Sequence, residues 1–442
     1  MIDLNALSRY SENNRIEAKR ATGGLPQSIW ETYSAFANTI GGILLLGVEE
    51  LADKSLQVVG LFDPEEQVQQ FWEIIMDSRK VSVNILKRED VRIETVEDKK
   101  LIVIEVPRAD RHDKPVYLYT DPFSGSYRRD GEGDYHCTEE EVRHMLRERG
   151  DLPEDRKLLY THSLQDFCQE TLLAYRKRLK DREPEHIWLK GSHEAFLRKL
   201  GAVGGNPPCP TAAGLLMFGR FPEIRKAFPY YSLVFRENGR EVLQADSGDW
   251  SGNLFDFYTQ VSEALAPAHQ GTVFDALREG LANAVIHADY GNTNGILVEK
   301  DEDGITITNP GGMRNGLEGR TGVSDPRNTT LVKLFALAGI GSEGGTGLAN
   351  MRSVSSIDWE PPEIREEFGP DRTIFSLRKA AEDHRKEILR YLTEQVEASE
   401  EELIKAAGRE PEEVRKVLSR LLKADLITKL ETSRGMRYRL KG

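Results

Sequence analysis

The stretch LREGLANAVIHADYGN, Leu277–Asn292, indicates the fold of the central part of this 442-residue chain. Its apolar residues recur with the period of an amphipathic helix that buries one face: Leu277, Leu281, Ala284 and Val285. Glu279, Asn283 and His287 are spaced four residues apart, so we expect them to share another face of that helix. A solvated helix surface more commonly carries Lys and Glu, so this row predicts a functional face.

Composition restricts the class of protein. The formal net charge is -13, so the surface as a whole does not attract nucleic acid, and such contact requires a local basic patch. The scattered cysteines Cys137, Cys168 and Cys209 argue against a disulfide framework or a cysteine zinc site and suit a reducing cytosol. The N-terminus has no apolar signal segment. The longest apolar run, Ile43–Leu46, is far shorter than the ~20 residues that cross a bilayer. We therefore expect a soluble, cytoplasmic protein with no membrane partner.

Pattern and length predict an α+β multidomain protein with four blocks. Residues 1–150 mix helix and strand, and residues 151–265 are expected to form a mixed connector, or scaffold, that packs with the next block. Residues 266–380 contain the opening helix. Residues 381–442 have the order helix, helix, helix, hairpin.

Local signals place several elements in the first block. Pro26 begins a predicted helix that Gly41-Gly42 ends, and VRIETV with LIVIEV forms a predicted hairpin. A second strand pair is expected around KPVYLY and SYRRD. Thr138 and Glu141 form a capping box for the helix that ends at Gly150. The polar segment DLPEDRKLLYTHS that follows is expected to be a linker.

Two glycine-rich segments follow the opening helix, namely ITITNPGGM at 305–313 and EGGTGLANMR at 343–352. Glycines at a helix start expose backbone amides that bind phosphate. Together with EGLAN, HADY and RNTTL, these segments resemble, in order, the GHKL or Bergerat-type ATP-binding fold, an α/β sandwich. They are also similar to the ATPase-like domain of a family of helicase-like proteins and transcriptional regulators. The chain has no Walker loop, so an ordinary helicase motor is not expected.

The GHKL resemblance implies an ATP site with Mg²⁺. Its residues would be Glu279, Asn283, Asn309, Gly311, Gly312, Gly345, Thr346 and Gly347. Asn283 would coordinate Mg²⁺, Glu279 would orient water as a general base, Asn309 with Gly311 and Gly312 would face adenine and ribose, and the GTG residues would lie against the phosphates. Asn309 replaces the adenine-recognition aspartate with an amide that still hydrogen-bonds, and Ala288 replaces the family arginine in HADY. ATP binding, ATP turnover and a degenerate structural fold are the alternatives.

Residues 11–50, SENNRIEAKRATGGLPQSIWETYSAFANTIGGILLLGVEE, show a second pattern. The element AFANTIGG and the strand ending in GVEE resemble the Schlafen AlbA-type domain, with Ala18 in place of a phenylalanine. Some Schlafen domains cut transfer RNA with three carboxylates. The resemblance therefore implies Glu12, Glu17 and Glu50 as catalytic and metal-binding residues.

Chemistry sets a condition on this carboxylate triad. A spacing of five separates Glu12 and Glu17 on either a strand or a helix, so they converge only if Asn13-Asn14 bends the chain. With Glu50 they would then suit Mg²⁺ or Mn²⁺, which polarises a phosphate and activates water. In the alternative, Glu17 pairs with Lys19 or another cation while Glu12 and Glu50 are solvated.

Basic residues in the first block favour nucleic-acid contact over cleavage. They are Lys19, Arg20, Lys114, Arg128 and Arg129. Tyr117, Tyr119 and Tyr127 alternate with them and are suited to stack on bases or to pack against a sheet. The alternative is that these cations only solubilise the surface.

The last block resembles a winged helix. Its third helix buries Val414, Val417, Leu418, Leu421 and Leu422, and shows Arg415, Lys416 and Arg420 elsewhere. The hairpin carries Lys429, Arg434, Arg437, Arg439 and Lys441. Such a helix enters the major groove while the wing contacts phosphates. The acidic helix start, Glu410, Glu412 and Glu413, favours the alternative of a winged helix that binds protein.

Two functions fit these features. We favour a regulator with nucleic-acid-binding domains at both ends. The nucleotide-binding domain between them would bias the arrangement of these two domains. The partners of this regulator would be DNA at the winged helix, DNA or RNA at the N-terminal block, and a second copy in a dimer, because winged-helix regulators read paired half-sites. The alternative is a metal-dependent ribonuclease, in phage defence, gated by ATP. A bare ATPase ranks third because the adenine aspartate is missing.

Overall fold

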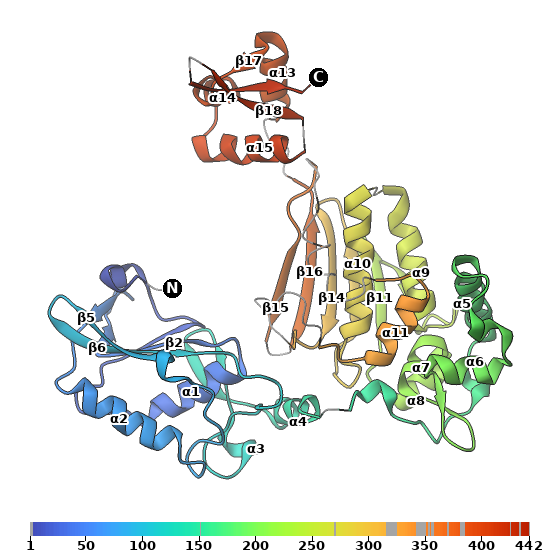
Figure 1. Ribbon diagram of the computed structural model, residues 1–442, viewed down its shortest axis with the longest axis horizontal. Coiled ribbons are helices and arrows are strands. Elements are labelled where there is room, and N and C mark those ends of the chain that lie inside the picture. The colour runs from blue at the N-terminus through green and yellow to red at the C-terminus, as the bar shows by residue number, and fades with distance from the viewer. Residues whose placement is uncertain are drawn as a thin grey trace. The chain divides into compact units, whose positions relative to one another are not determined.

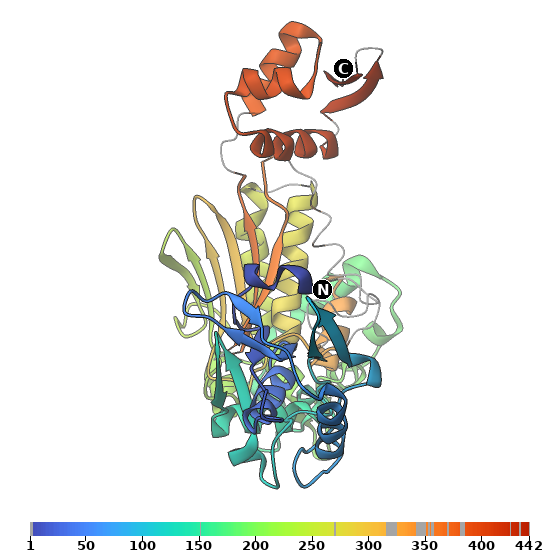
Figure 2. The ribbon, with the colours of Figure 1, turned by 90° about the vertical axis from the view of Figure 1, so that its left-hand side faces the viewer.

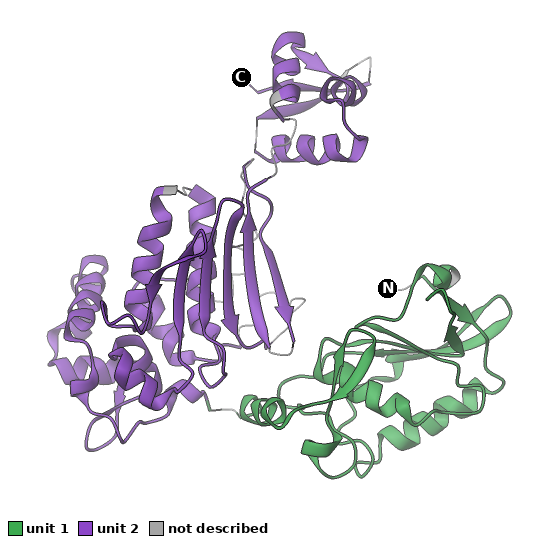
Figure 3. Cartoon of the chain, turned by 180° about the vertical axis from the view of Figure 1, so that it is seen from behind, with its two compact units in different colours: residues 1–152 green, residues 153–442 purple. Residues whose placement is uncertain are grey.

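The structure is a computed structural model that describes residues 3–150, 152–268, 271–314, 325–341, 351, 354, 358–368, 371–380, 385–424, 426–432 and 435–441. The chain divides into two compact units, residues 1–152 and residues 153–442 (Figure 3). Both units combine helices with sheets, so the expected α+β multidomain class is confirmed. None of the described helices is both long enough and apolar enough to cross a membrane.

Unit 1, residues 1–152, is built on a sheet with the strand order β1-β2-β6-β5. The strands are β1 (Ile16–Lys19), β2 (Gly42–Leu46), β5 (Val91–Val96) and β6 (Lys99–Val106). β1 runs parallel to β2, whereas β2, β6 and β5 are antiparallel neighbours. β5 and β6 form the hairpin that the sequence predicts.

Helices cover one face of this sheet (Figure 1). α1 (Ser28–Asn38) and α2 (Pro64–Ile75) contribute Phe36 and Phe71 to a core that includes Leu44 and Ile102. Alternate strand residues, such as Leu45 and Val103, belong to a second cluster with the segment η1 (Leu4–Arg9). The sheet therefore separates two apolar layers.

The remaining elements of unit 1 are short. They are β3 (Val48–Glu50), β4 (Leu56–Val58), η2 (Arg88–Asp90), α3 (Pro122–Gly125), β7 (Tyr127–Asp130), β8 (Gly133–His136) and α4 (Glu139–Glu148). The second predicted strand pair is wrong in its partners, because β7 pairs with β8 and only an isolated bridge joins Tyr117 to Ser126. The capping box of Thr138 and Glu141 is confirmed at the start of α4.

Unit 2, residues 153–442, contains a sheet with the order β12-β11-β13-β14-β16-β15. The strands are β11 (Leu233–Glu237), β12 (Arg240–Gln244), β13 (Ile296–Lys300), β14 (Gly304–Pro310), β15 (Glu363–Glu367) and β16 (Arg372–Arg378). Only the β11–β13 pairing is parallel among these described strands. β13 and β14 form the strand pair predicted from GILVEK and GITITN.

Helices pack on one face of the unit 2 sheet (Figure 1). α10 (Gly271–His287) lies against β14 and β16, with α9 (Leu254–Leu265) beside it. The predicted apolar face of α10 is buried, and Leu277, Leu281 and Val285 join the core. Along β14, Ile305 and Ile307 point into the same core, while Thr306 and Thr308 alternate with them.

The first part of unit 2, residues 153–268, contributes helices to this core. Its elements are η3 (Glu154–Arg156), η4 (Leu164–Asp166), α5 (Gln169–Arg182), η5 (Ile187–Lys190), α6 (His193–Leu200), β9 (Val203–Gly204), β10 (Cys209–Pro210), α7 (Ala212–Phe218), α8 (Phe221–Ala227) and η6 (Ala266–Ala268). α11 (Thr329–Leu337) packs against α6, α7 and α10. Phe218 and Leu277 consequently belong to one continuous apolar cluster.

The expectation of a polar linker after Gly150 is wrong. Asp155 is buried, and its carboxylate accepts hydrogen bonds from the backbone amides of Thr330 (2.6 Å) and Leu331 (2.9 Å). These amides lie in the first turn of α11, where backbone donors lack helical partners. Asp155 therefore caps a helix that is 175 residues away in sequence, which polarity alone could not reveal.

The last part of unit 2, orange to red in Figures 1 and 2, has the predicted order of three helices and a hairpin. The elements are α13 (Arg385–Gln395), β17 (Glu397–Ala398), α14 (Glu400–Ala407), α15 (Pro411–Lys423), β18 (Ile427–Thr432) and β19 (Gly435–Leu440). Val414, Val417, Leu418 and Leu421 of α15 are buried in a separate small core. Leu422, also expected to be buried, is only partly so.

Candidate functional site

The predicted functional face of α10 holds a bonded pair of polar side chains. The Asn283 amide donates to the backbone carbonyl of Glu279 (2.9 Å) and to its carboxylate (3.1 Å). It also lies 4.0 Å from the sulfur of Met351. Glu279 is 9% exposed, so the pair is an acid beside an amide in a largely desolvated position.

Gly280 explains how α10 approaches the sheet. A Cβ added at this position would lie 3.1 Å from the ring of Phe375 on β16. A larger side chain would push the helix away from the strand. The glycine of EGLAN is therefore a packing residue, and its neighbour Glu279 is directed to a different face from the sheet contact.

The three sequence motifs HADY, NPGG and RNTTL meet at the end of α10. The amide of Asp289 donates to the carbonyl of Pro310 (2.9 Å), which joins HADY to NPGG. The side chain of Asn328 donates to the carbonyls of Ile286 (2.8 Å) and Ala288 (2.9 Å). Motifs about twenty to forty residues apart are thus connected by direct hydrogen bonds.

Arg327 completes this junction from within the protein. Its guanidinium donates to the carbonyls of His287 and Gly312, the latter at 3.1 Å. Gly311 has a left-handed backbone (φ 90°), and a Cβ there would lie 2.8 Å from the guanidinium. Glycine at 311 therefore leaves room for Arg327. Arg327 and Asn328 belong to the motif RNTTL, but the sequence predicts no role for either residue, because the tertiary fold alone determines their partners.

His287 is neutral in this environment. Burial and, to a smaller extent, the positive charges of Arg327 and Arg314 together lower the pKa of His287 to about 4, while Asp325 opposes them. A neutral imidazole at the end of α10 avoids repulsion from the two guanidinium groups. The residue therefore belongs to the junction, although it continues the row formed by Glu279 and Asn283.

The other predicted nucleotide-binding residues belong to β14, to the turn after it and to a segment outside the described residues. Asn309 is buried on β14, and its amide donates to the carbonyl of Pro310 (3.1 Å). Gly311 and Gly312 lie in the turn that follows β14. Gly345, Thr346 and Gly347 lie outside the described residues. The described part of the candidate site is therefore α10, the NPGG turn and the start of α11.

α5 holds the other end of α11. Tyr175 donates to the carbonyl of Leu334 (2.8 Å), and Arg178 donates to that of Ala338 (2.8 Å). Arg182 donates to the carbonyl of Ala336 (2.5 Å). The final carbonyls of a helix have no helical partners, so these side chains of the scaffold block complete α11. The sequence indicated a helix at α5 but not these contacts.

The carboxylates of unit 1 come together from three separate segments. Glu12 precedes β1, Glu17 lies on β1 and Glu50 ends β3. The Glu12 carboxylate accepts from the Ala18 amide (3.0 Å), and its own amide donates to Glu50 (3.4 Å). Burial raises the pKa of the Glu12 carboxyl, and the charges of Glu17 and Glu50 raise it further, against the Ala18 amide and Lys19.

Cations already compensate this carboxylate cluster, Glu12, Glu17 and Glu50. Glu17 forms ion pairs with Lys19 and with Arg129 (2.8 Å), and Glu50 forms one with Lys54 (3.2 Å). Within the part of the chain that the structure describes, Glu12, Glu17 and Glu50 do not form a group whose ligand atoms all lie within 4.8 Å of one another. The geometry therefore agrees with the predicted pairing of Glu17 with Lys19. Glu12 and Glu50 lie beside this pair and are joined by the hydrogen bond from the Glu12 amide.

The expectation that Arg129 contacts nucleic acid is wrong. Arg129 is 2% exposed, and its guanidinium binds Glu17, Asp134 (2.9 Å) and the carbonyl of Asn13 (2.8 Å). A buried guanidinium with these partners is not available to a phosphate. Arg129 is instead the internal counter-ion that holds the Asn13 bend and the Glu17 side chain together.

The other predicted cations of unit 1 also have protein partners. Lys114 donates to the carbonyl of Asn38, and Arg128 pairs with Glu141 (3.3 Å). Arg20 pairs loosely with Glu49 (3.6 Å) and keeps 68% of its side chain exposed. Of the tyrosines, Tyr119 is exposed, whereas Tyr127 stacks on His136.

The winged-helix cations divide into paired and unpaired groups. Arg415 pairs with Glu400 (2.7 Å), Arg437 with Glu397 (3.1 Å) and Glu402 (3.0 Å), and Arg420 with Glu360. Arg434 lies outside the described residues. Lys416 and Arg439 are exposed, and no ion pair to either is seen within the described residues.

Family models match successive parts of the chain. The model described as "Schlafen, AlbA_2" matches residues 12–138, and one described as a domain of unknown function matches residues 143–234. The model "Putative ATP-dependent DNA helicase recG C-terminal" matches residues 294–370. The model "TFIIE alpha subunit" matches residues 374–434. No curated protein matches the chain.

Solved structures are also similar to the chain. A crystal structure of a protein from Corynebacterium diphtheriae is 15% identical, with a TM-score of 0.40, and the match covers 97% of this chain and 95% of that one. The N-terminal domain of a "Putative ATP-dependent DNA Helicase RecG-related Protein" from Nitrosomonas europaea is 35% identical, with a TM-score of 0.24. That match covers 30% of this chain and 88% of the solved domain.

The family models fall on the regions where sequence motifs and geometry agree. The first covers the sheet and carboxylates of unit 1, the third covers β13 to β15 with the NPGG turn, and the last covers the winged helix. The chain is therefore a multidomain protein of the Schlafen AlbA type that also carries a RecG-type ATPase-like domain and a TFIIE-type winged helix.

Proposed function

We propose that this chain is a nucleic-acid-binding, ATP-binding regulatory protein that acts in transcription. In this proposal a nucleotide bound in residues 266–380 biases how the AlbA-type domain and the winged helix engage nucleic acid. The observation that carries it is the bonded pair of Glu279 and Asn283 beside the junction of HADY, NPGG and RNTTL. These residues are the described part of the set that the GHKL resemblance implies.

The residues present fit Mg·ATP on chemical grounds. The Asn283 amide oxygen and the Glu279 carboxylate are oxygen ligands of the kind that Mg²⁺ prefers. Bound Mg²⁺ would supply charge neutralisation between phosphate oxygens. Asn283 would hold the ion, Glu279 would accept a hydrogen bond from water, and Asn309 with the NPGG turn would face the base.

Calorimetry with ATP and Mg²⁺ tests the nucleotide site. Wild type should bind one nucleotide per chain, and Asn283→Ala should lose detectable binding because it removes the amide without adding bulk. Asn294→Ala is the matched control, since Asn294 is an exposed loop asparagine whose side-chain amide donates to its neighbour Asn292 (3.0 Å). Equal affinity in Asn283→Ala and wild type would contradict the proposed site.

Nucleic-acid binding in this proposal depends on a few exposed cationic side chains, because the chain as a whole is acidic. Lys416 and Arg439 are exposed on α15 and β19 of the winged helix, and Arg20 is exposed in unit 1. Phosphate contacts of this kind give affinity that falls with salt. The net charge of -13 confines such contact to these domains.

A metal-dependent ribonuclease is the second candidate, and one observation favours it. The charges of Glu17 and Glu50 both raise the pKa of Glu12, after the larger effect of burial, and the Glu12 amide donates to Glu50 (3.4 Å), so the three carboxylates lie in one neighbourhood. Their donor set suits Mg²⁺ or Mn²⁺, which would activate water for attack on a phosphate. A metal ion would nevertheless have to displace the pairings of Glu17 with Arg129 and Lys19, which is why binding is preferred.

Labelled transfer RNA with Mn²⁺ separates the two candidates. The regulator predicts intact RNA with both wild type and Glu12→Gln. Cleavage by wild type that disappears in Glu12→Gln would instead establish the nuclease. Glu49→Gln is the matched control, because Glu49 lies on the same strand as Glu50 and pairs with the exposed Arg20.

A further inference from the structure

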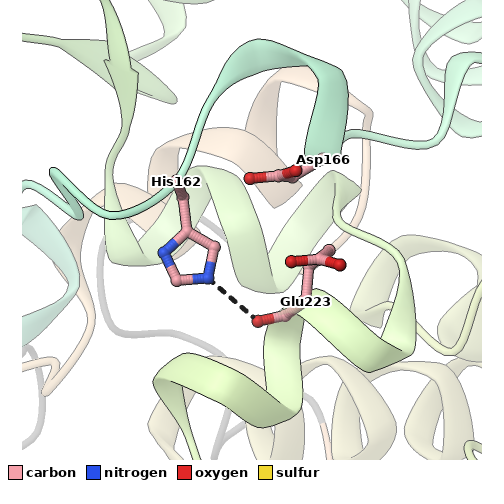
Figure 4. Close-up of side chains that lie close together, drawn as sticks. All are labelled: His162, Asp166 and Glu223. Carbon is pink, nitrogen blue, oxygen red and sulfur yellow. Dashed lines mark hydrogen bonds between the residues drawn. The ribbon is translucent and has the colours of Figure 1, made fainter.

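A histidine and two carboxylates converge in the scaffold region of unit 2, and none of the three belongs to the sites proposed above. They are His162, Asp166 and Glu223, whose ligand atoms all lie within 4.8 Å of one another (Figure 4). We propose that these three residues form a binding site for a divalent transition-metal ion of the zinc class. The site is independent of the proposed ATP and nucleic-acid sites.

Backbone contacts hold the three residues in place before any ion binds. His162 follows a bridge between Leu158 and Thr211, and its amide donates to the carbonyl of Leu159 (2.9 Å). The carbonyl of Asp166, the last residue of η4, accepts from the amide of Arg220 (3.0 Å). Glu223 lies in the first turn of α8. The two segments that carry the ligands are therefore fixed against each other.

The hydrogen bonds of His162 suit a metal ligand. Its Nε2 lies 3.2 Å from the carbonyl of Glu223, and its Nδ1 lies 3.1 Å from the hydroxyl of Thr161. A hydroxyl either donates or accepts a hydrogen bond, so the Thr161 hydroxyl can accept a hydrogen bond from Nδ1–H when Nε2 binds an ion. Ligating histidines usually donate their other ring N–H to such a partner, which fixes the ring.

Charge in the cluster also favours a cation. His162 is 9% exposed, and two carboxylates face it in Figure 4. One oxygen of Asp166 accepts from the amide of Ser163 (2.8 Å), which leaves the other for an ion. The present counter-charge on Glu223 is Lys226, at 2.7 Å, with 64% of its side chain exposed. An exposed lysine is released at little cost, because such ion pairs contribute ~0–1 kcal/mol.

The ligand set selects the class of metal. One imidazole nitrogen with two carboxylates matches the donors of zinc sites, whereas Mg²⁺ and Ca²⁺ prefer oxygen alone. Bond lengths of ~2.0–2.2 Å place tetrahedral ligands ~3.4 Å apart, so each side chain needs to move by only about 1 Å. Three protein ligands leave a fourth position for water.

Titration of the full-length, tag-free protein with Zn²⁺ against a chromogenic chelator tests the site. Wild type should bind one Zn²⁺, and both His162→Ala and Glu223→Gln should weaken this binding at least ~10-fold. Glu223→Gln is included because Glu223 is only partly buried, so it keeps the fold if the histidine variant does not. If His162→Ala does not fold, loss of binding in folded Glu223→Gln supports the proposal, whereas wild-type binding by a folded His162→Ala contradicts it.

His112→Ala is the matched control, since His112 pairs with Asp110 (2.6 Å) on the exposed surface of unit 1. It should bind Zn²⁺ as wild type does. No binding of Zn²⁺ by wild type would overturn the proposal. So would equal binding by wild type, His162→Ala and Glu223→Gln, because the ion would then be held elsewhere.

Discussion

The two candidate sites differ in how the chain assembles them. Glu279 and Asn283 lie one turn apart on α10 and are bonded directly to each other. Glu12, Glu17 and Glu50 come from three segments, and buried Arg129 holds one of them from 112 residues away. A site on one helix needs only local geometry, whereas a cluster built by tertiary contacts also needs an internal counter-ion. The second therefore uses part of its charge for the fold.

Arg129→Met tests the structural side of this comparison and has the largest expected effect. Removing the guanidinium leaves buried Glu17 with only Lys19 as a partner and takes the cation from half-buried Asp134, and breaking a buried ion pair typically costs ~3–5 kcal/mol. Chemical denaturation should show this loss in unit 1. Arg20→Met is the control and should change stability by less than ~1 kcal/mol, since Arg20 is exposed. A similar small loss in both variants would mean that Arg129 is not the internal counter-ion.

Acid should weaken unit 2 through His287. The folded pKa of about 4 is below the ordinary value of ~6.5, so the folded state resists protonation. Its contribution is complete above pH ~6.5 and is lost as the pH falls toward 4. A shift of 2.5 units at 1.36 kcal/mol each gives at most roughly 3 kcal/mol, an upper bound because the residue keeps some exposed surface.

Denaturation of wild type and His287→Gln at pH 7 and pH 4.5 measures this dependence. The difference between the two pH values should be smaller in the variant, because glutamine does not titrate. An equal loss of unfolding free energy between pH 7 and pH 4.5 in the two proteins would show that groups other than His287 determine the acid sensitivity of unit 2.

Asn283→Ala should have the smallest effect on stability. Its amide contacts Glu279 and Met351 on a partly exposed face of α10, and a single net hydrogen bond contributes ~0.5–1.5 kcal/mol. We expect a loss of about 1 kcal/mol or less by denaturation. A loss as large as that of Arg129→Met would remove the contrast between a site residue and a structural one.

The sequence predicted the elements that depend on local periodicity. The buried face of α10, the hairpin of β5 and β6, the capping box of Thr138 and the order of the winged-helix elements were all visible as patterns. Each rests on residues within a few turns of one another, so the signal is in the spacing itself.

The charged residues were mispredicted where their partners are distant in sequence. Asp155 lies in the predicted polar linker but caps α11, and Arg129 is a predicted phosphate ligand but is buried against Glu17. Arg327 and Asn328 had no predicted role, yet they join the motifs at the end of α10. A charged residue looks the same in sequence whether its partner is solvent, a nucleic acid or a distant backbone group.

Duplex DNA binding measured by fluorescence anisotropy, with and without Mg·ATP, tests the central claim most directly. Wild type should bind the duplex with an affinity that Mg·ATP changes several-fold. Asn283→Ala should bind it equally with and without nucleotide, because only the nucleotide site is altered. Wild-type binding that does not respond to Mg·ATP, or an equal response in Asn283→Ala, would contradict a nucleotide-biased regulator.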